Sequence, residues 1–180
     1  MKPAVFLDRD GTIIEDLHYP REAEKVRLCP NAIEGMRELS LKGYLLFVVS
    51  NQSGVGRGII KDHEFKAVHD KTCELLKANG IEIAEFAFCF HLPSDECQCR
   101  KPKTGLIPKE YQGAKLDLKK SFTIGDKECD LELGENIGAT PFLVLTGKGA
   151  KSFEELKSQG RHYRHGADIL AVAAQIPPIG

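Results

Sequence analysis

The feature that most constrains how this chain can fold is a regular alternation of short apolar runs with longer amphipathic segments. Strands that are covered on both faces read as nearly continuous apolar runs, and helices of about 10–15 residues between them are typical of β-α units. The alternation therefore predicts a doubly wound α/β fold, in which a mostly parallel sheet carries helices on both faces. The runs lie at residues 4–7, 44–49, 84–90, 121–124 and 141–145.

The amphipathic segments between these runs predict the helices and the domain organisation. After the last run we expect helical pieces and a short edge strand near residues 167–170. No internal repeat, low-complexity tract or linker divides the sequence, so we expect a single domain over residues 1–180. The predicted helices lie at residues 32–42, 62–79, 107–116 and 130–137.

The charge balance of the chain argues against several classes of partner. The 180 residues include 25 Lys and Arg against 26 Asp and Glu, and the formal net charge is -1. Such a chain creates no overall field that would attract nucleic acid or an anionic membrane. No apolar stretch reaches the roughly 18 residues of a transmembrane helix, and the N-terminus does not resemble a signal peptide. We expect a cytoplasmic monomer that acts on a small molecule.

Carboxylates follow two of the apolar runs. Asp8 and Asp10 come directly after the first run, and their i, i+2 spacing in an extended segment directs both side chains to one side. Asp126 follows the fourth run, and the carboxyl ends of strands in such sheets form the ligand crevice. Three hard oxygen donors suit Mg²⁺. Asp8 is placed to attack phosphorus as a nucleophile, and Asp10 to act as general acid and base.

Four short motifs extend this pattern and carry a resemblance. Asp8-Arg9-Asp10-Gly11-Thr12 is followed by Ser50, then by Lys101, then by Gly125-Asp126-Lys127-Glu128-Cys129-Asp130. In this order they resemble the four motifs of the haloacid dehalogenase superfamily, over most of the chain. The resemblance implies a Rossmann-like core and Mg²⁺-dependent hydrolysis through an aspartyl phosphate. No insertion is long enough to form a large cap domain.

The resemblance also implies roles for the motif residues. Asp8 would become phosphorylated, Asp10 would bind Mg²⁺ through its backbone carbonyl, and Asp126 would complete the metal site. Lys101 would neutralise the developing charge and align Asp8. Asp130 is expected to orient Lys101 or the turn at Asp126 rather than to bind the metal. The residues expected at the substrate phosphates are Ser50, Asn51, Gln52, Arg57, Arg100 and Lys127, with Lys148 as a further candidate.

The cysteines predict a second metal site. Cys89-x-His91 is followed by Cys97-x-Cys99, and together they offer three thiolates and one imidazole. A complete Cys₃His set leaves no open coordination position, which is typical of structural Zn²⁺. The loop at residues 89–99 has no apolar pattern of its own, so the metal would order it. Because Lys101 follows Cys99 so closely, the zinc loop would also fix the backbone that carries the lysine.

The run from Cys89 to Pro102 resembles one branch of the superfamily, which contains heptose bisphosphate phosphatases and the histidinol-phosphate phosphatase domain. The segments 50–58 and 146–148 resemble the heptose enzymes, whereas the short zinc loop with Leu92-Pro93 resembles histidinol phosphatase. The favoured prediction is removal of the C7 phosphate of D-glycero-D-manno-heptose 1,7-bisphosphate in ADP-heptose biosynthesis. Histidinol-phosphate hydrolysis in histidine biosynthesis is the alternative.

Functions of other classes explain fewer of these motif residues. A non-catalytic zinc module would leave Asp8, Asp126 and Lys101 without a purpose. A dehalogenase would not need Asp10 as an acid, and a phosphomutase would need a large cap to exclude water.

Overall fold

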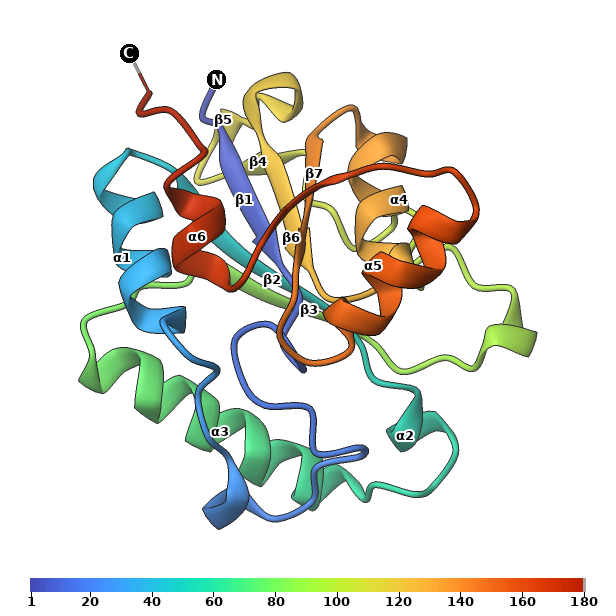
Figure 1. Ribbon diagram of the computed structural model, residues 1–180. Coiled ribbons are helices and arrows are strands. Elements are labelled where there is room, and N and C mark those ends of the chain that lie inside the picture. The colour runs from blue at the N-terminus through green and yellow to red at the C-terminus, as the bar shows by residue number, and fades with distance from the viewer. Residues whose placement is uncertain (180) are drawn as a thin grey trace.

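The computed structural model describes residues 1–179, and Gly180 lies outside the described residues. A six-stranded sheet in the order β3-β2-β1-β6-β7-β8 forms the centre of the molecule, and each neighbouring pair of strands is parallel (Figure 1). This sheet confirms the predicted α/β fold class. The strands are β1 (Ala4–Leu7), β2 (Leu45–Asn51), β3 (Glu85–Cys89), β6 (Phe122–Gly125), β7 (Thr140–Val144) and β8 (Arg164–Gly166).

Alternate residues of the central strands supply separate cores on the two faces of the sheet. Val5 and Leu7 pack on the face covered by α1, α3 and α6, while Phe6 packs on the face covered by α4 (Figure 1). The α-helices are α1 (Ala32–Leu41), α2 (Ser53–Gly56), α3 (Asp62–Ala78), α4 (Glu128–Ile137), α5 (Gly149–Ser158) and α6 (Ile169–Ala173). Three 3₁₀ turns are η1 (Ala23–Lys25), η2 (Pro93–Asp95) and η3 (Leu118–Lys120).

The order of the strands reverses at β1. From β1 the chain moves outward through β2 to β3, then returns to β6 on the other side of β1 and continues to β7 and β8. Ligands of doubly wound sheets bind at such a switch point, outside the carboxyl ends of the strands. The loops after β1, β2 and β6, which carry the motifs of Asp8, Ser50 and Asp126, therefore meet at this edge of the sheet.

The segment predicted as a helix at residues 107–116 is instead a small antiparallel hairpin. β4 (Glu110–Tyr111) pairs with β5 (Ala114–Lys115). The turn residues Gln112 and Gly113 have φ angles of 48° and 74°. Positive φ at both positions is the conformation of two-residue hairpin turns that match the twist of their strands. The prediction of a helix is wrong because this turn, not the apolar spacing, determines the local structure.

The edge strand of the C-terminal region exists but lies earlier than the predicted residues 167–170. β8 ends at Gly166, and Asp168 is the N-cap of α6, where its carboxylate accepts a hydrogen bond from the Ala171 N–H at 2.9 Å. The other predicted strands and helices are confirmed, with ends that shift by no more than about two residues. No helix within residues 1–179 is long and apolar enough to cross a membrane.

Candidate active site

A cavity of about 240 Å³ opens at the carboxyl edge of the sheet. Its walls come from the loops after β1, β2 and β6, from the segment after the cysteines, and from residues 16–20. Cys89, at the end of β3, and His91 do not line this cavity and belong to a separate cluster beside it. The predicted site residues that line the cavity are Asp8, Asp10, Ser50, Asn51, Gln52, Arg100, Lys101, Lys127 and Lys148.

Asp8 lies at the end of β1 and is surrounded by donors. The Ser50 hydroxyl donates to Asp8 Oδ1 at 2.7 Å, Lys101 Nζ lies 3.0 Å from the same oxygen, and Lys127 Nζ lies 3.3 Å from Oδ2. Burial alone would raise the pKa of Asp8, but the two ammonium groups and the hydroxyl outweigh burial and hold this pKa well below its usual range. Asp8 is therefore an ionised carboxylate at neutral pH, as a carboxylate nucleophile must be.

Lys101 lies buried between two carboxylates. Its Nζ is 3.0 Å from Asp8 Oδ1 and 2.6 Å from Asp130 Oδ1, and it donates to the Val49 carbonyl at 2.6 Å. Burial would lower the pKa of Lys101, but Asp130 and Asp8 more than reverse this and raise it above its ordinary value. Asp130 also accepts the backbone N–H of Lys127 at 3.1 Å. Asp130 thus orients both the lysine and the turn after β6, in the arrangement that the sequence predicts.

Three oxygen atoms meet around the Lys127 ammonium group. Its Nζ lies 2.9 Å from Asp126 Oδ1, 3.3 Å from Asp8 Oδ2 and 3.3 Å from the backbone carbonyl of Asp10. These are the residues that the resemblance assigns to Mg²⁺. The positive charge of the ammonium group therefore lies where the divalent cation is expected. The other Asp126 oxygen accepts the Lys148 backbone N–H at 2.8 Å, which directs Oδ1 at the same point. This set of hard oxygens fits a divalent cation.

The pKa values of Asp8 and Asp126 are shifted in opposite directions. Burial raises the pKa of Asp126 to about 6, against the opposing effect of Lys127 and with a further rise from Asp8.

The close approach of the loops after β1 and β6 depends on Gly11, whose φ is 86°. A Cβ at Gly11 would collide with the Asp126 carboxylate. Glycine is therefore required where the turn after β1 meets the turn after β6.

The Asp10 carboxylate lines the cavity and is held by Arg9 and Gln52. Arg9 donates through Nε to Asp10 Oδ2 at 3.2 Å and through Nη2 to Oδ1 at 3.1 Å. The Gln52 amide donates to Asp10 Oδ2 at 2.5 Å and to Ser50 Oγ at 3.1 Å. Gln52, predicted at a substrate phosphate, has its NH₂ group directed at these neighbours. The sequence alone predicts no role for Arg9. Its position between Asp8 and Asp10 is the one sequence feature that could indicate such a role.

Two further residues predicted at the substrate phosphates, Asn51 and Arg57, are placed differently from each other. The Asn51 Nδ2 donates to the Lys101 backbone carbonyl at 3.1 Å, and Asn51 Oδ1 accepts the Lys101 backbone N–H at 3.0 Å. Both polar ends of the Asn51 side chain are therefore engaged by Lys101. Arg57 is the exposed C-cap of α2 and does not line the cavity.

The remaining predicted cations lie at the rim of the cavity. Arg100 donates through Nη1 to the backbone carbonyl of His91 at 3.3 Å, which ties it to the cysteine loop. Lys148 Nζ lies 3.6 Å from Asp16 Oδ2 on the opposite loop. Both residues line the cavity and are available to an anionic group of a ligand.

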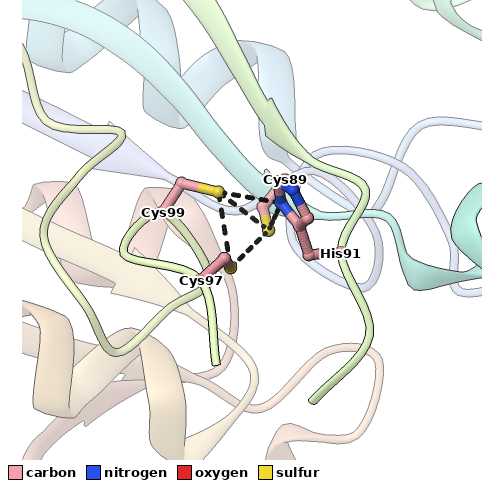
Figure 2. Close-up of side chains that lie close together, drawn as sticks. All are labelled: Cys89, His91, Cys97 and Cys99. Atoms are coloured by element: carbon pink, nitrogen blue, oxygen red, sulfur yellow. Dashed lines mark hydrogen bonds between the residues drawn. The ribbon is translucent and has the colours of Figure 1, made fainter. Parts of the chain in front are cut away.

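The side chains of Cys89, His91, Cys97 and Cys99 converge on one point beside the cavity, as Figure 2 shows. The three sulfur atoms lie 3.3 to 3.7 Å from one another, and His91 Nδ1 lies 3.6 Å from the Cys89 sulfur and 3.2 Å from that of Cys99. Tetrahedral Zn²⁺ with thiolate bonds of about 2.3 Å separates its ligand atoms by roughly 3.8 Å. All six cysteines are free thiols. The cluster therefore fits a four-coordinate zinc ion.

Known proteins are similar to this chain over most of its length. The family profile described as HAD-hydrolase-like matches residues 98–172. The "Probable D-glycero-D-manno-heptose-1,7-bisphosphate 7-phosphatase" of Thermoplasma volcanium is 37% identical over 142 residues, which cover 78% of this chain and 97% of that protein. The chain belongs to the haloacid dehalogenase-like (HAD) hydrolase family. The superfamily and the hydrolase class predicted for this HAD hydrolase are thereby confirmed.

Other similar proteins fall into the two groups that the cysteine run resembles. The D-glycero-beta-D-manno-heptose-1,7-bisphosphate 7-phosphatase of Yersinia pestis is 36% identical, over 81% of this HAD hydrolase and 82% of that protein. The histidine biosynthesis bifunctional protein HisB of Campylobacter jejuni subsp. doylei is 34% identical, over 86% of this chain and 44% of that protein. The crystal structure of D,D-heptose 1,7-bisphosphate phosphatase from B. bronchiseptica, complexed with magnesium and phosphate, matches with a TM-score of 0.84 and 31% identity over 97% of both chains.

Proposed function

We propose that this HAD hydrolase is a Mg²⁺-dependent phosphatase that removes the C7 phosphate of D-glycero-D-manno-heptose 1,7-bisphosphate through an aspartyl phosphate. The observation that carries the proposal is the Asp8 carboxylate, which is ionised and held between Ser50, Lys101 and Lys127. Phosphoryl transfer spreads negative charge over three oxygens, and catalysis depends on fixed donors and cations around them. The names of the similar proteins support both the phosphatase chemistry and the heptose substrate.

In the first step, a carboxylate oxygen of Asp8 attacks the phosphorus of the C7 phosphate. As the bond from Asp8 to phosphorus forms, the bond from phosphorus to the sugar oxygen breaks. Asp10 gives its proton to that oxygen, so the sugar leaves as an alcohol that still carries its C1 phosphate. Ser50 and Lys101 lie against Asp8 and would donate to the phosphoryl oxygens.

In the second step, water attacks the phosphorus of the aspartyl phosphate. Asp10, now a carboxylate, takes a proton from the water as the new bond forms. The bond between phosphorus and Asp8 breaks, and its electron pair returns to the Asp8 carboxylate. Inorganic phosphate leaves, and Asp10 is again protonated for the next substrate.

The two metal sites would serve different purposes. Asp8, Asp126 and the backbone carbonyl of Asp10 would hold Mg²⁺, which when bound supplies positive charge to the transferring phosphoryl group. The Lys127 ammonium group would then serve the phosphate oxygens, as its place in the motif predicts. The cysteine cluster would hold structural Zn²⁺ and keep the backbone of Lys101 in position.

The number of cations in the cavity favours a substrate with two phosphates. Lys101 and Lys127 lie at Asp8, and Arg100 and Lys148 line the same cavity as further cations. A bisphosphate can use both pairs, whereas histidinol phosphate has one phosphate and carries an amine. Histidinol phosphate remains the second candidate because Asp16, which also lines the cavity, offers a carboxylate to such an amine.

The decisive experiment measures phosphate release from heptose 1,7-bisphosphate and from histidinol phosphate, with Mg²⁺ present. We expect kcat/KM to be at least about tenfold higher for the heptose bisphosphate, and NMR of the product to show phosphate remaining at C1. Arg100→Gln should lower kcat/KM for the bisphosphate about 10-fold or more and leave histidinol phosphate nearly unaffected. A preference for histidinol phosphate would reject the heptose substrate, and no turnover of either would reject the phosphatase.

We also propose that residues 1–180 form one catalytic domain that works as a monomer in the cytoplasm. Support comes from the six-stranded sheet, because the ends of its strands bring the nucleophile and the residues around it together. Light scattering after gel filtration should give a mass near 19.9 kDa. A mass near twice this value would contradict the monomer.

A further inference from the structure

We propose that Arg9 is a positioning residue that holds the Asp10 carboxylate in place for proton transfer. The proposal rests on the phosphatase function above and extends it to a buried cation that the mechanism does not otherwise use. Arg9 lies directly between the nucleophile and the general acid in the sequence.

Arg9 is buried and paired with a single carboxylate. Its side chain is 1% exposed, and a buried guanidinium is costly unless it is paired and hydrogen-bonded. Within residues 1–179, Asp10 is the only carboxylate at ion-pair distance from Arg9, with Nη2 at 3.0 Å from Oδ2. Nε and Nη2 together contact both Asp10 oxygens. This two-point contact fixes the plane of the carboxylate as well as its position.

Arg9 contacts Asp10 without lining the cavity. Asp10 lines the cavity, but Arg9 does not. The guanidinium carbon lies 5.5 Å from the ring centroid of Phe65 and 5.7 Å from that of Phe88. These rings confine the guanidinium and attract its charge. Arg9 is therefore placed to act on Asp10 and not on the substrate.

Gln52 connects the Arg9–Asp10 pair to the nucleophile. Arg9 Nη2 donates to Gln52 Oε1 at 3.0 Å. Because a guanidinium can only donate, this contact determines which end of the Gln52 amide faces Arg9 and leaves its NH₂ group for Asp10 and Ser50. Ser50 in turn donates to Asp8. One series of hydrogen bonds thus fixes the general acid relative to the nucleophile.

The position of Asp10 matters because its carboxyl group must meet two oxygens in succession. It protonates the leaving sugar oxygen and later accepts a proton from the attacking water. A displacement of about 1 Å at a reacting group can cost roughly 100-fold in rate. Without Arg9 the carboxylate would be held at one oxygen only, by the Gln52 amide, and could rotate about that contact. The loss would fall on the proton transfers and spare the attack of Asp8 on phosphorus.

The test compares substrates whose leaving groups differ in their need for an acid. Arg9→Met keeps a long side chain that suits the aromatic surroundings but removes all donors. In the full-length metal-loaded enzyme, we expect turnover of the heptose bisphosphate to fall about 30- to 100-fold. p-Nitrophenyl phosphate releases a phenolate that needs no acid, so the rate of its first turnover should stay within about threefold of the wild-type rate. Its later turnovers should slow, because hydrolysis of the aspartyl phosphate still needs Asp10 as a base.

A double-mutant cycle tests the same proposal without the second substrate. If Arg9 acts through Asp10, then adding Arg9→Met to Asp10→Asn should change the residual rate by less than about threefold. Arg37→Met is the matched control, because it makes the same replacement at an exposed arginine whose one side-chain hydrogen bond is to the Asn79 carbonyl, away from the cavity. It should affect both substrates equally and slightly. Arg9→Lys keeps the buried charge with fewer donors, gives an intermediate loss, and replaces the Met variant should that variant fail to fold.

Several results would overturn the role of Arg9. These are an equal loss in the first turnover of both substrates, unchanged turnover of the heptose bisphosphate, or additive effects in the double mutant. Failure of the proposed function would look different. In that case the wild-type enzyme itself would yield no aspartyl phosphate when the reaction is quenched in acid.

Discussion

The two candidate metal sites are neighbours in space but are built in opposite ways. In the carboxylate site, Asp8 and Asp126 are each 5% exposed or less and directly follow the sheet strands β1 and β6. In the cysteine cluster only Cys89, at the end of β3, is buried. His91 is exposed, and the loop between it and Cys97 contains η2 as its one regular element.

This difference indicates where the order of each site comes from. The carboxylate site is held by the sheet and by the buried ammonium group of Lys101, so the fold forms it before a divalent cation binds. No residue from 90 to 98 is buried, so the cysteine loop has no core of its own, and we expect its order to depend on a metal. Lys101 belongs to both regions, because it follows the cluster in the chain and pairs with Asp8 in the site.

The largest effect should come from removing the nucleophile from the preformed site. Asp8→Asn keeps the shape of the side chain and leaves Lys101 paired with Asp130, but the amide cannot form a phosphoenzyme. We expect turnover to fall by about 10⁴-fold or more, with the thermal midpoint changed by only about 5 °C or less. Phosphate release and thermal unfolding measure the two effects, with the exposed Asp62→Asn as control. Retained hydrolysis would reject the covalent mechanism, and a collapse of stability would show that Asp8 itself holds the site together.

A smaller loss of activity, with a large loss of stability, is expected for Lys101→Met. This change leaves the buried Asp8 and Asp130 carboxylates without their common cation, and breaking such a buried pair costs about 3–5 kcal/mol. We expect turnover to fall about 10³-fold and urea unfolding to show the lost stability. Adding Asp130→Leu should restore part of the stability but none of the activity. Recovery of activity in the double variant would contradict a direct role of Lys101 at the phosphate.

The features that the sequence predicts well are those determined by local pattern. Buried parallel strands leave apolar runs, and their polar ends carry Asp8, Ser50 and Asp126, so the switch-point rule is enough to bring these residues together. The spacing of the cysteine cluster likewise predicts a four-ligand set that the geometry now supports. In both cases the chemistry lies in residues close in sequence or at equivalent strand ends.

The features that the sequence does not reveal depend on the partners that distant side chains find. Asn51 and Gln52 are both predicted at the substrate phosphates and both line the cavity, but the sequence does not reveal that Asn51 also binds the Lys101 backbone across 50 positions and Gln52 binds Asp10 across 42. In the sequence, Arg9 is only a residue between two acids. The structure adds the rings of Phe65 and Phe88, which lie beside its guanidinium group. Such contacts follow from packing in three dimensions, for which no periodic signal exists.

Removal of metals should separate the two regions directly. We expect withdrawal of Mg²⁺ to abolish turnover reversibly while the thermal midpoint stays nearly constant, because charge within the fold supports the carboxylate site.

Loss of zinc should act on the cysteine loop instead. Cys99→Ser, or stripping of zinc with a strong chelator, should expose residues 90–100 to protease and lower turnover about 10- to 100-fold through displacement of Lys101. Cys73→Ser, outside the cluster, is the control. Elemental analysis should find one zinc per chain, and an unchanged loop after its removal would contradict the proposed dependence on metal.

The smallest effect is expected at Asn51, which links the loop after the cysteines to β2. Asn51→Ala removes both hydrogen bonds to the Lys101 backbone, so that backbone should exchange amide hydrogens faster. We expect kcat to fall about tenfold while KM stays within about twofold, because the lysine is displaced and no substrate contact is lost. Asn51→Asp keeps the acceptor for the Lys101 N–H and should lose less. If KM rises and kcat is unchanged, then Asn51 contacts the phosphate as its motif predicts, and the cysteine loop alone fixes Lys101.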